Sequence, residues 1–316
     1  MKITIVVPCF NEEEMLDYTI VEFQKFFAHN IEKKIFTPDS EIILVDDGSK
    51  DKTWNKICEA TELESYFKGV KLSRNKGHQN ALLAGISYAE GDFIITIDAD
   101  LQDDINAITE MVKLARNGSD IVYGVRKSRE TDTKFKKITA EAYYKVMKAF
   151  GVELVFNHAD FRGMSKRAVD ALLEYKEVNL FLRGIVPQLG YTTSIVYYDR
   201  KERLAGETKY PLKKMLSFAW QGVTSFSTIP LKALTWMGSV LALISIGITI
   251  WAIYVKLFSG SAVPGWASTV IPVVFLGGVQ LLGLGILGEY LGKVYLEVKG
   301  RPRFFVEAKI SSEDKE

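Results

Sequence analysis

The chain has 316 residues, which is enough for one large α/β domain with a smaller addition. Its 40 Lys and Arg residues balance 39 Asp and Glu residues, and this balance argues against a general nucleic-acid-binding surface. The two cysteines, Cys9 and Cys58, are not spaced as metal ligands, so we expect both to be reduced and buried in a cytosolic protein.

The N-terminal part of the chain alternates short apolar runs with amphipathic stretches. The apolar runs predict strands at residues 3–9, 41–46, 70–73, 93–97, 121–123 and 192–198. Helical periodicity covers residues 12–27, 51–64, 77–89, 105–116, 165–175 and 179–189, while residues 133–158 read as a helix followed by irregular structure. This alternation predicts a mostly parallel sheet with helices on both faces, in which ligands bind at the carboxyl ends of the strands.

The C-terminal part is far more apolar. Residues 233–255 and 263–288 contain no charged side chain, and each predicts a transmembrane helix, because a span needs about 20 apolar residues. Lys and Arg gather before and after this pair, whereas the link between them carries Lys256 alone, so we expect both ends of the chain to face the cytoplasm. Residues 211–232 are amphipathic, which predicts a helix in the membrane interface; packing against the catalytic domain is the alternative.

The expected organisation therefore has four parts. They are a cytosolic catalytic domain (1–210), an interfacial helix (211–232), a transmembrane hairpin (233–292) and a cytosolic tail (293–316). We expect a multi-pass protein of the cell membrane, and the hairpin and the helices after residue 133 offer surfaces for a homo-oligomer.

Polar residues follow the predicted strands, in segments 8–12, 46–49, 74–75 and 98–102. No G-x-G-x-x-G or P-loop motif follows the first strand, which argues against a dinucleotide oxidoreductase or a P-loop NTPase. Asp98 and Asp100 stand two residues apart and can face one divalent cation, and Gln102 adds a neutral oxygen; such ligands suit Mg²⁺ or Mn²⁺. Helix capping by Asp is the alternative explanation.

Segments 6–13, 45–49, 74–77 and 98–102 together resemble the GT-A domain of family 2 glycosyltransferases. Segments 123–126, 160–162, 203–210 and 288–292 are similar to the polyisoprenyl-phosphate members, such as bactoprenol glucosyltransferases and dolichol-phosphate mannose synthases. The resemblance covers almost the whole chain. It implies a Rossmann-like α/β GT-A fold with a C-terminal interfacial helix and two transmembrane helices.

The resemblance also implies a role for each matching residue. The nucleotide-sugar pocket would contain Pro8, Asn11, Glu12, Asp46, Asp47, Arg74 and Asp98. Asp100 and Gln102 would hold the metal, and the lipid phosphate would be bound by Arg126, Arg162, Arg203 and Lys209. The catalytic set would be Asp98, Asp100, Asp160 and Arg126. His78 stands where the family often has lysine, so we expect either a donor contact or a surface position at the start of a helix.

Physical arguments accompany two of these roles. Arg203 and Lys209 precede the interfacial helix, where a lipid headgroup would arrive, although general attraction to anionic lipids also explains them. A phosphate monoester has its second pKa near about 6 and is already an oxyanion at neutral pH. We therefore expect Asp160 to position groups or to balance nearby arginines rather than to remove a proton.

The implied reaction is inverting transfer of a sugar from a nucleotide donor to a polyprenyl phosphate, for cell-envelope glycosylation. UDP-glucose with undecaprenyl phosphate is the preferred pair; UDP-N-acetylglucosamine is the nearest rival donor, and GDP-mannose with dolichyl phosphate ranks below both. A processive polysaccharide synthase would carry a Q-x-x-R-W motif and more membrane helices, and the sequence has neither. A non-catalytic sugar-nucleotide sensor would have no need of Asp98, Asp100 and Gln102.

Overall fold

A computed structural model describes residues 1–127, 158–178, 180–199, 224, 227–258 and 266–312. The chain divides into two compact units. The first comprises Met1–Lys145, Glu153–Pro211 and Gly300–Glu316, and the second comprises Val146–Val152 and Leu212–Lys299. The residues at the C-terminal end therefore return to the unit that contains the N-terminus.

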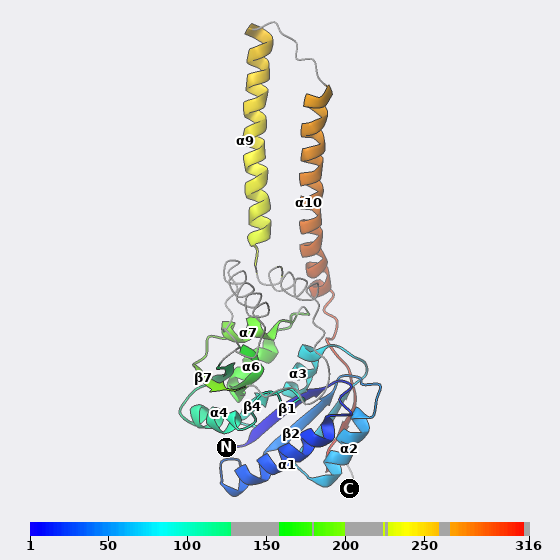
Figure 1. The fold of residues 1–316 in the computed structure, drawn as a ribbon, viewed down its shortest axis with the longest axis vertical. Coiled ribbons are helices and arrows are strands. Elements are labelled where there is room, and N and C mark those ends of the chain that lie inside the picture. The colour runs from blue at the N-terminus through cyan, green and yellow to red at the C-terminus, as the bar shows by residue number, and fades with distance from the viewer. Residues whose placement is uncertain (128–157, 179, 200–223, 225–226, 259–265, 313–316) are drawn as a thin grey trace. The chain divides into compact units, whose positions relative to one another are not determined.

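Among the described residues, the first unit is built on an eight-stranded sheet with the order β7-β5-β6-β4-β1-β2-β3-β8. Figure 1 labels β1, β2, β4 and β7 of this sheet. The strands are β1 (Ile3–Cys9), β2 (Glu41–Asp46), β3 (Phe67–Leu72), β4 (Phe93–Thr96), β5 (Ile121–Arg126), β6 (His158–Ser165), β7 (Thr193–Tyr198) and β8 (Val306–Ile310). β1 pairs in parallel with β2 and β4, β2 with β3, and β5 with β7. β6 runs antiparallel to β4 and β5, and β8 runs antiparallel to β3. The expected mostly parallel α/β sheet is confirmed.

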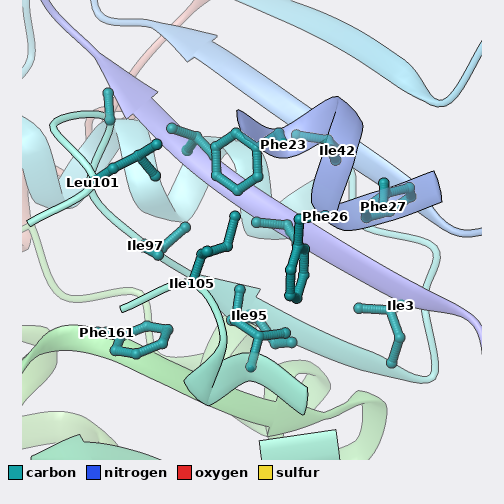
Figure 2. Close-up of a cluster of buried hydrophobic side chains, with 14 of the residues drawn as sticks. Ile3, Phe23, Phe26, Phe27, Ile42, Ile95, Ile97, Leu101, Ile105 and Phe161 are labelled. Carbon is teal, nitrogen blue, oxygen red and sulfur yellow. The ribbon is translucent and has the colours of Figure 1, made fainter. Parts of the chain in front are cut away.

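Helices cover both faces of this sheet. They are α1 (Leu16–Glu32), α2 (Thr53–Leu63), α3 (His78–Ser87), α4 (Ala107–Arg116), α6 (Lys166–Glu174) and α7 (Leu182–Gln188). On one face, Phe23 and Phe27 of α1 join Ile3 and Ile95 of the sheet in a buried cluster (Figure 2). On the other face α3 packs closely, since a Cβ on its Gly85 would lie 2.3 Å from Val6 Cγ1. Burial on both faces explains why β1 and β2 are apolar along almost their whole length.

Two strands were absent from the sequence prediction. β6 carries Asp160 and Arg162 among its eight residues, and buried charges in a strand hide the apolar pattern by which a strand is recognised. β8 follows a long helix and is short, with alternating half-buried and exposed residues. Residues 293–316, expected to form a cytosolic tail, contain the end of α10 and an edge strand of the sheet.

The second unit contains two long helices, α9 (Ile229–Phe258) and α10 (Trp266–Val298), which contact each other. A Cβ on Gly283 of α10 would lie 3.1 Å from the side chain of Leu234 in α9. Within the part of the chain that the structure describes, one stretch, Phe275–Val298, is long and apolar enough to cross a membrane by length and composition. This stretch overlaps the second predicted span and begins later. The first predicted span lies within α9, and most of the predicted interfacial helix lies outside the described residues.

Candidate active site

Hydrogen bonds join the segments that follow β1 and β2. The backbone N–H of Asp47 donates to the carbonyl of Cys9 at 2.9 Å, and the N–H of Asn11 donates to Ser49 Oγ at 3.0 Å. Asn11 Oδ1 accepts the N–H of Lys50 at 3.0 Å, with the Asn11 backbone in the left-handed region at a φ of 53°. Asparagine tolerates that conformation, because its short polar side chain can bond locally. These contacts bring two of the predicted nucleotide-binding segments together.

The two carboxylates at the end of β2 have different surroundings. Asp46 is fully buried, and its Oδ1 accepts the N–H of Ser49 at 3.0 Å, while its Oδ2 has no hydrogen-bond partner. A buried oxygen without a partner is costly, so Asp46 Oδ2 is suited to receive a donor group of a ligand. Asp47 instead accepts the N–H groups of Lys76 and Gly77, at 2.7 and 2.9 Å. Its carboxylate anchors the turn before α3, and the nucleotide contact expected for Asp47 stays a prediction.

The turn that follows these two carboxylates requires glycine. Gly48 has a φ of 66°, and a Cβ there would lie 2.5 Å from the backbone carbon of Arg74. Arg74 itself is exposed at the exit of β3. The close backbone contact sets the exit of β2 against the exit of β3, as the predicted pocket requires.

His78, the first residue of α3, lies between two carboxylates. Its Nε2 is 3.5 Å from Asp98 Oδ1 and 3.5 Å from Asp160 Oδ2. Burial lowers the pKa of His78, but Asp160 and Asp98 outweigh it and raise the pKa overall. Desolvation raises the pKa of Asp98 to about 6, with His78 opposing and Asp103, Asp160 and Asp100 adding to the rise. His78 starts α3 and its side chain is 43% exposed, as expected for a surface position at the start of a helix, and the donor contact stays a prediction.

Asp160 is surrounded by cations. Arg162 Nη2 lies 2.7 Å from Asp160 Oδ1, and Arg183 Nη2 lies 2.9 Å from Asp160 Oδ2. Burial alone would raise the pKa of Asp160, but Arg183, His78 and Arg162 hold it well below its usual range. The carboxylate is therefore ionised at neutral pH and is a poor proton acceptor.

Arg162 is 1% exposed, and its Nη1 also donates to the carbonyl of Leu182 at 3.4 Å. The phosphate contact expected for Arg162 does not fit this burial, because its guanidinium faces Asp160 inside the protein. Arg183 was missed by the sequence analysis. It stands in a short helix outside every motif, and no signal in the sequence marks it.

The loop after β4 carries the predicted metal ligands. Asp100 Oδ1 accepts the N–H of Gln102 at 3.3 Å, and Leu101 between them has a φ of 45°. Asp100 is half-buried and Gln102 is buried. Among the described residues, no three His, Cys, Asp or Glu side chains form a group that would hold a metal ion. Carboxylate and amide oxygens are the types of ligand that suit a hard divalent cation, and metal binding by Asp100 and Gln102 stays a prediction.

The remaining predicted residues are placed as follows. Pro8 is buried in β1, and the backbone N–H of Glu12 donates to Thr53 Oγ1 at 2.9 Å. Arg126 ends β5 and contacts Tyr198 and Asp103, two residues that the sequence analysis did not select. Arg203 and Lys209 lie outside the described residues.

Residues 4–173 match the model of Glycosyl transferase family 2. The chain belongs to this family. An uncharacterized glycosyltransferase of Bacillus subtilis, YkoT, is 50% identical over 313 residues, which cover 98% of this chain and 93% of the relative. The prophage bactoprenol glucosyl transferase homolog of Escherichia coli is 39% identical over 310 residues, covering 97% and 98%. Mannosyl-3-phosphoglycerate synthase from Rubrobacter xylanophilus has a TM-score of 0.49 at 16% identity, covering 76% of this chain and 75% of that structure.

Family membership and the likeness to bactoprenol glucosyltransferases over nearly the full chain confirm the resemblance inferred from the motifs. The protein is thus a family 2 glycosyltransferase with an α/β fold and a mostly parallel sheet.

Proposed function

We propose that the protein transfers a sugar from a nucleoside diphosphate to a polyprenyl phosphate, with UDP-glucose and undecaprenyl phosphate as the preferred pair. One observation carries this proposal: Asp46 and the loop with Asp98 and Asp100 follow the two strands that flank β1 in parallel. The carboxyl ends of such strands form the ligand edge of an α/β sheet. The relatives named bactoprenol glucosyl transferase support the choice of acceptor.

The donor site consists of residues on this edge. The unpartnered oxygen of Asp46 would accept a hydrogen bond from the nucleoside, beside Pro8, Asn11 and Glu12. Asp98 would contact the donor sugar or ribose, with His78 fixing its carboxylate. Hydrogen bonds from buried, fixed groups give such a pocket its selectivity.

Asp100 and Gln102 would hold Mg²⁺ or Mn²⁺. When bound there, the cation would neutralise the diphosphate and stabilise the charge that develops as the nucleoside diphosphate leaves. The left-handed backbone at Leu101 fits this role, since residues held in sparsely populated conformations gather at functional sites.

The acceptor phosphate would meet Arg126, Arg203 and Lys209. A phosphate monoester attacks without the help of a base, since it is largely ionised at neutral pH. Asp160 is suited to a positioning role, because Arg183, His78 and Arg162 keep it ionised and weakly basic. Single displacement at the anomeric carbon would invert its configuration.

The C-terminal strand indicates how many times the chain would cross a membrane. α10 ends at Val298, and β8 then pairs with β3, placing Ile310 opposite Gly69. The residues that end at Pro211 and those that begin at Gly300 thus belong to one unit, and one unit lies on one side of a bilayer. A chain that returns to the same side crosses an even number of times. We therefore propose that α9 crosses together with α10, with the catalytic unit in the cytoplasm.

The acceptor is tested by comparing undecaprenyl phosphate with undecaprenol, the same lipid without its phosphate. We expect the full chain to release UDP from UDP-glucose only with the phosphorylated lipid and a divalent cation. Equal release with both lipids, or with neither, would contradict the proposed acceptor. UDP-N-acetylglucosamine and GDP-mannose, tested in parallel, identify the donor.

A further inference from the structure

Three side chains from different elements meet beside the proposed metal loop. Tyr198, the last residue of β7, donates its hydroxyl to Asp103 Oδ1 at 2.5 Å. Arg126, the last residue of β5, donates its Nε to the same hydroxyl at 3.4 Å, and its Nη2 lies 3.6 Å from Asp103 Oδ1. One tyrosine hydroxyl therefore joins the loop after β4 to the guanidinium that ends β5.

Two of the three residues are buried, and the third is partly exposed. Asp103 is 3% exposed and Tyr198 is 2% exposed, whereas the Arg126 side chain retains 21% of its accessible surface. The carboxylate and the hydroxyl are thus sealed inside the protein, and the cation reaches the surface. A buried carboxylate requires compensation, and both the hydroxyl and the guanidinium provide it.

The ring of Tyr198 is held in place by the motif at residues 160–162. Phe161 meets it edge to face, with the ring centroids 5.3 Å apart and an interplanar angle of 80°. Phe161 in turn packs on Gly124, where a Cβ would lie 2.5 Å from its ring. The tyrosine hydroxyl therefore has little freedom to leave its position between Asp103 and Arg126.

The way in which Arg126 is held leaves its terminal nitrogens for another anion. A carboxylate that paired directly with a guanidinium would engage two of its nitrogens. Among the described residues, Arg126 donates a hydrogen bond from Nε to the Tyr198 hydroxyl, and Nη2 stays outside hydrogen-bond distance of Asp103. The arrangement orients the guanidinium and leaves its terminal nitrogens available to a second anion.

We infer that Tyr198 and Asp103 are positioning residues that hold Arg126 ready to bind a substrate phosphate. This inference rests on the proposed function, in which Arg126 binds the acceptor phosphate. Asp103 is three residues after Asp100, so the same hydrogen bond keeps the metal loop and the phosphate-binding arginine at a fixed separation.

Tyr198→Phe tests the inference, because it removes the hydroxyl and keeps the ring. Tyr197→Phe is the matched control: Tyr197 precedes it in β7 and is 59% exposed. We expect Tyr198→Phe to raise the KM for undecaprenyl phosphate about tenfold, with a smaller change in kcat, because a hydrogen bond to a charged group is lost. Tyr197→Phe should leave both constants and the unfolding temperature unchanged.

A double-mutant cycle separates positioning from a merely structural effect. In the Arg126→Ala background, Tyr198→Phe should raise the KM no further, since the guanidinium that it positions is gone. Asp103→Asn keeps an acceptor for the tyrosine hydroxyl and should fall between the wild type and Tyr198→Phe. Equal constants for Tyr198→Phe and Tyr197→Phe, or additive effects with Arg126→Ala, would overturn the inference.

A second measurement distinguishes failure of the proposed function from failure of the inference about Tyr198 and Asp103. Binding of geranyl phosphate, a short water-soluble isoprenyl phosphate, is measured by calorimetry on the full chain alongside the transfer assay. A wild-type protein that neither binds geranyl phosphate nor transfers sugar to undecaprenyl phosphate would overturn the proposed function and, with it, this inference. If the wild type is active but the effects of Tyr198→Phe and Arg126→Ala are additive, the positioning inference is wrong and the proposed function stands.

Discussion

The imidazole Nε2 of His78 lies 3.5 Å from the Oδ1 of Asp98, at the start of α3 and at the exit of β4. The same nitrogen lies 3.5 Å from Asp160, so one side chain links the carboxylate proposed to contact the donor sugar to a buried carboxylate of β6. When His78 is protonated, its imidazolium offsets the mutual repulsion of the two carboxylates and fixes both.

Replacing His78 should therefore impair donor use. We expect His78→Ala to lower kcat/KM for the nucleotide sugar by about tenfold, and His78→Lys to retain more activity because its ammonium group can pair with the same carboxylates. His29→Ala is the control, since His29 is exposed on α1. Steady-state kinetics with varied donor measure the effect. Equal activity of His78→Ala and His29→Ala would argue against this role.

Asp160→Asn should retain more activity per folded molecule than Asp100→Ala. The first change leaves the proposed metal ligand in place and removes a carboxylate that is too weakly basic to accept a proton. The second removes a proposed ligand of the cation. Both variants are assayed for transfer after the folded fraction is measured. Equal losses would count against this ranking.

The same Asp160→Asn variant should be less stable than the wild type. Asp160 is buried and contacts Arg162 and Arg183, and the change leaves the fully buried Arg162 without its charged partner. Removing one partner of a buried ion pair costs about 3–5 kcal/mol. Thermal unfolding of the solubilised protein should show a clear fall in the midpoint. An unchanged midpoint would mean that Arg162 finds another partner.

Asp120 makes a pH-dependent contribution to stability. Arg167 binds both of its carboxylate oxygens, and hydrogen bonds from Thr192 and Ser165 add to this, so the pKa of Asp120 lies below its usual range. A carboxylate with a lowered folded-state pKa stabilises the fold above its unfolded pKa of about 3.9, and this stability is lost as the pH falls further.

Asp120→Asn should cost about 1–3 kcal/mol at pH 7, and the difference from wild type should shrink below about pH 4. Asp170→Asn is the control, because Asp170 forms an exposed pair with Lys166 and should contribute little. Denaturant unfolding at several pH values measures both. A difference for Asp120→Asn that stayed constant into acid would contradict the assignment.

The C-terminal strand should stabilise the catalytic sheet. Deleting residues 306–316 removes β8, the antiparallel partner of β3, and exposes the backbone of β3 at the edge of the sheet. We expect a lower unfolding temperature and more aggregation of the purified protein. A chain ending at residue 312 keeps β8 and serves as the control. Equal behaviour of the two truncated chains would show that β8 contributes nothing to the sheet.

Much of the fold could be predicted where burial is uniform. β1 and β2 begin and end at the residues that their apolar runs predicted, because helices cover both of their faces. β6 could not be predicted in this way. Its charged residues are buried through pairs with His78 and Arg183, which come from elsewhere in the chain, and a local pattern contains no information on such partners.

The residues of the candidate site also fall into those that the sequence could identify and those that it could not. Asp46, Asp98 and Asp100 could be selected because they directly follow apolar strands. Asp47 was selected for the same reason, yet its oxygens bind the backbone of the turn before α3. Tyr198 and Asp103 could not be selected, since their importance comes from a contact between residues 95 positions apart.

The central claim is transfer of a sugar to a lipid phosphate, and the mass of the lipid product tests it most directly. The full chain is incubated with undecaprenyl phosphate, Mg²⁺ or Mn²⁺, and UDP-glucose, UDP-N-acetylglucosamine or GDP-mannose in separate reactions. We predict undecaprenyl phosphate carrying one hexose from UDP-glucose, formed by the wild type and absent with Asp100→Ala. No glycosylated lipid phosphate from any of these donors would contradict the account.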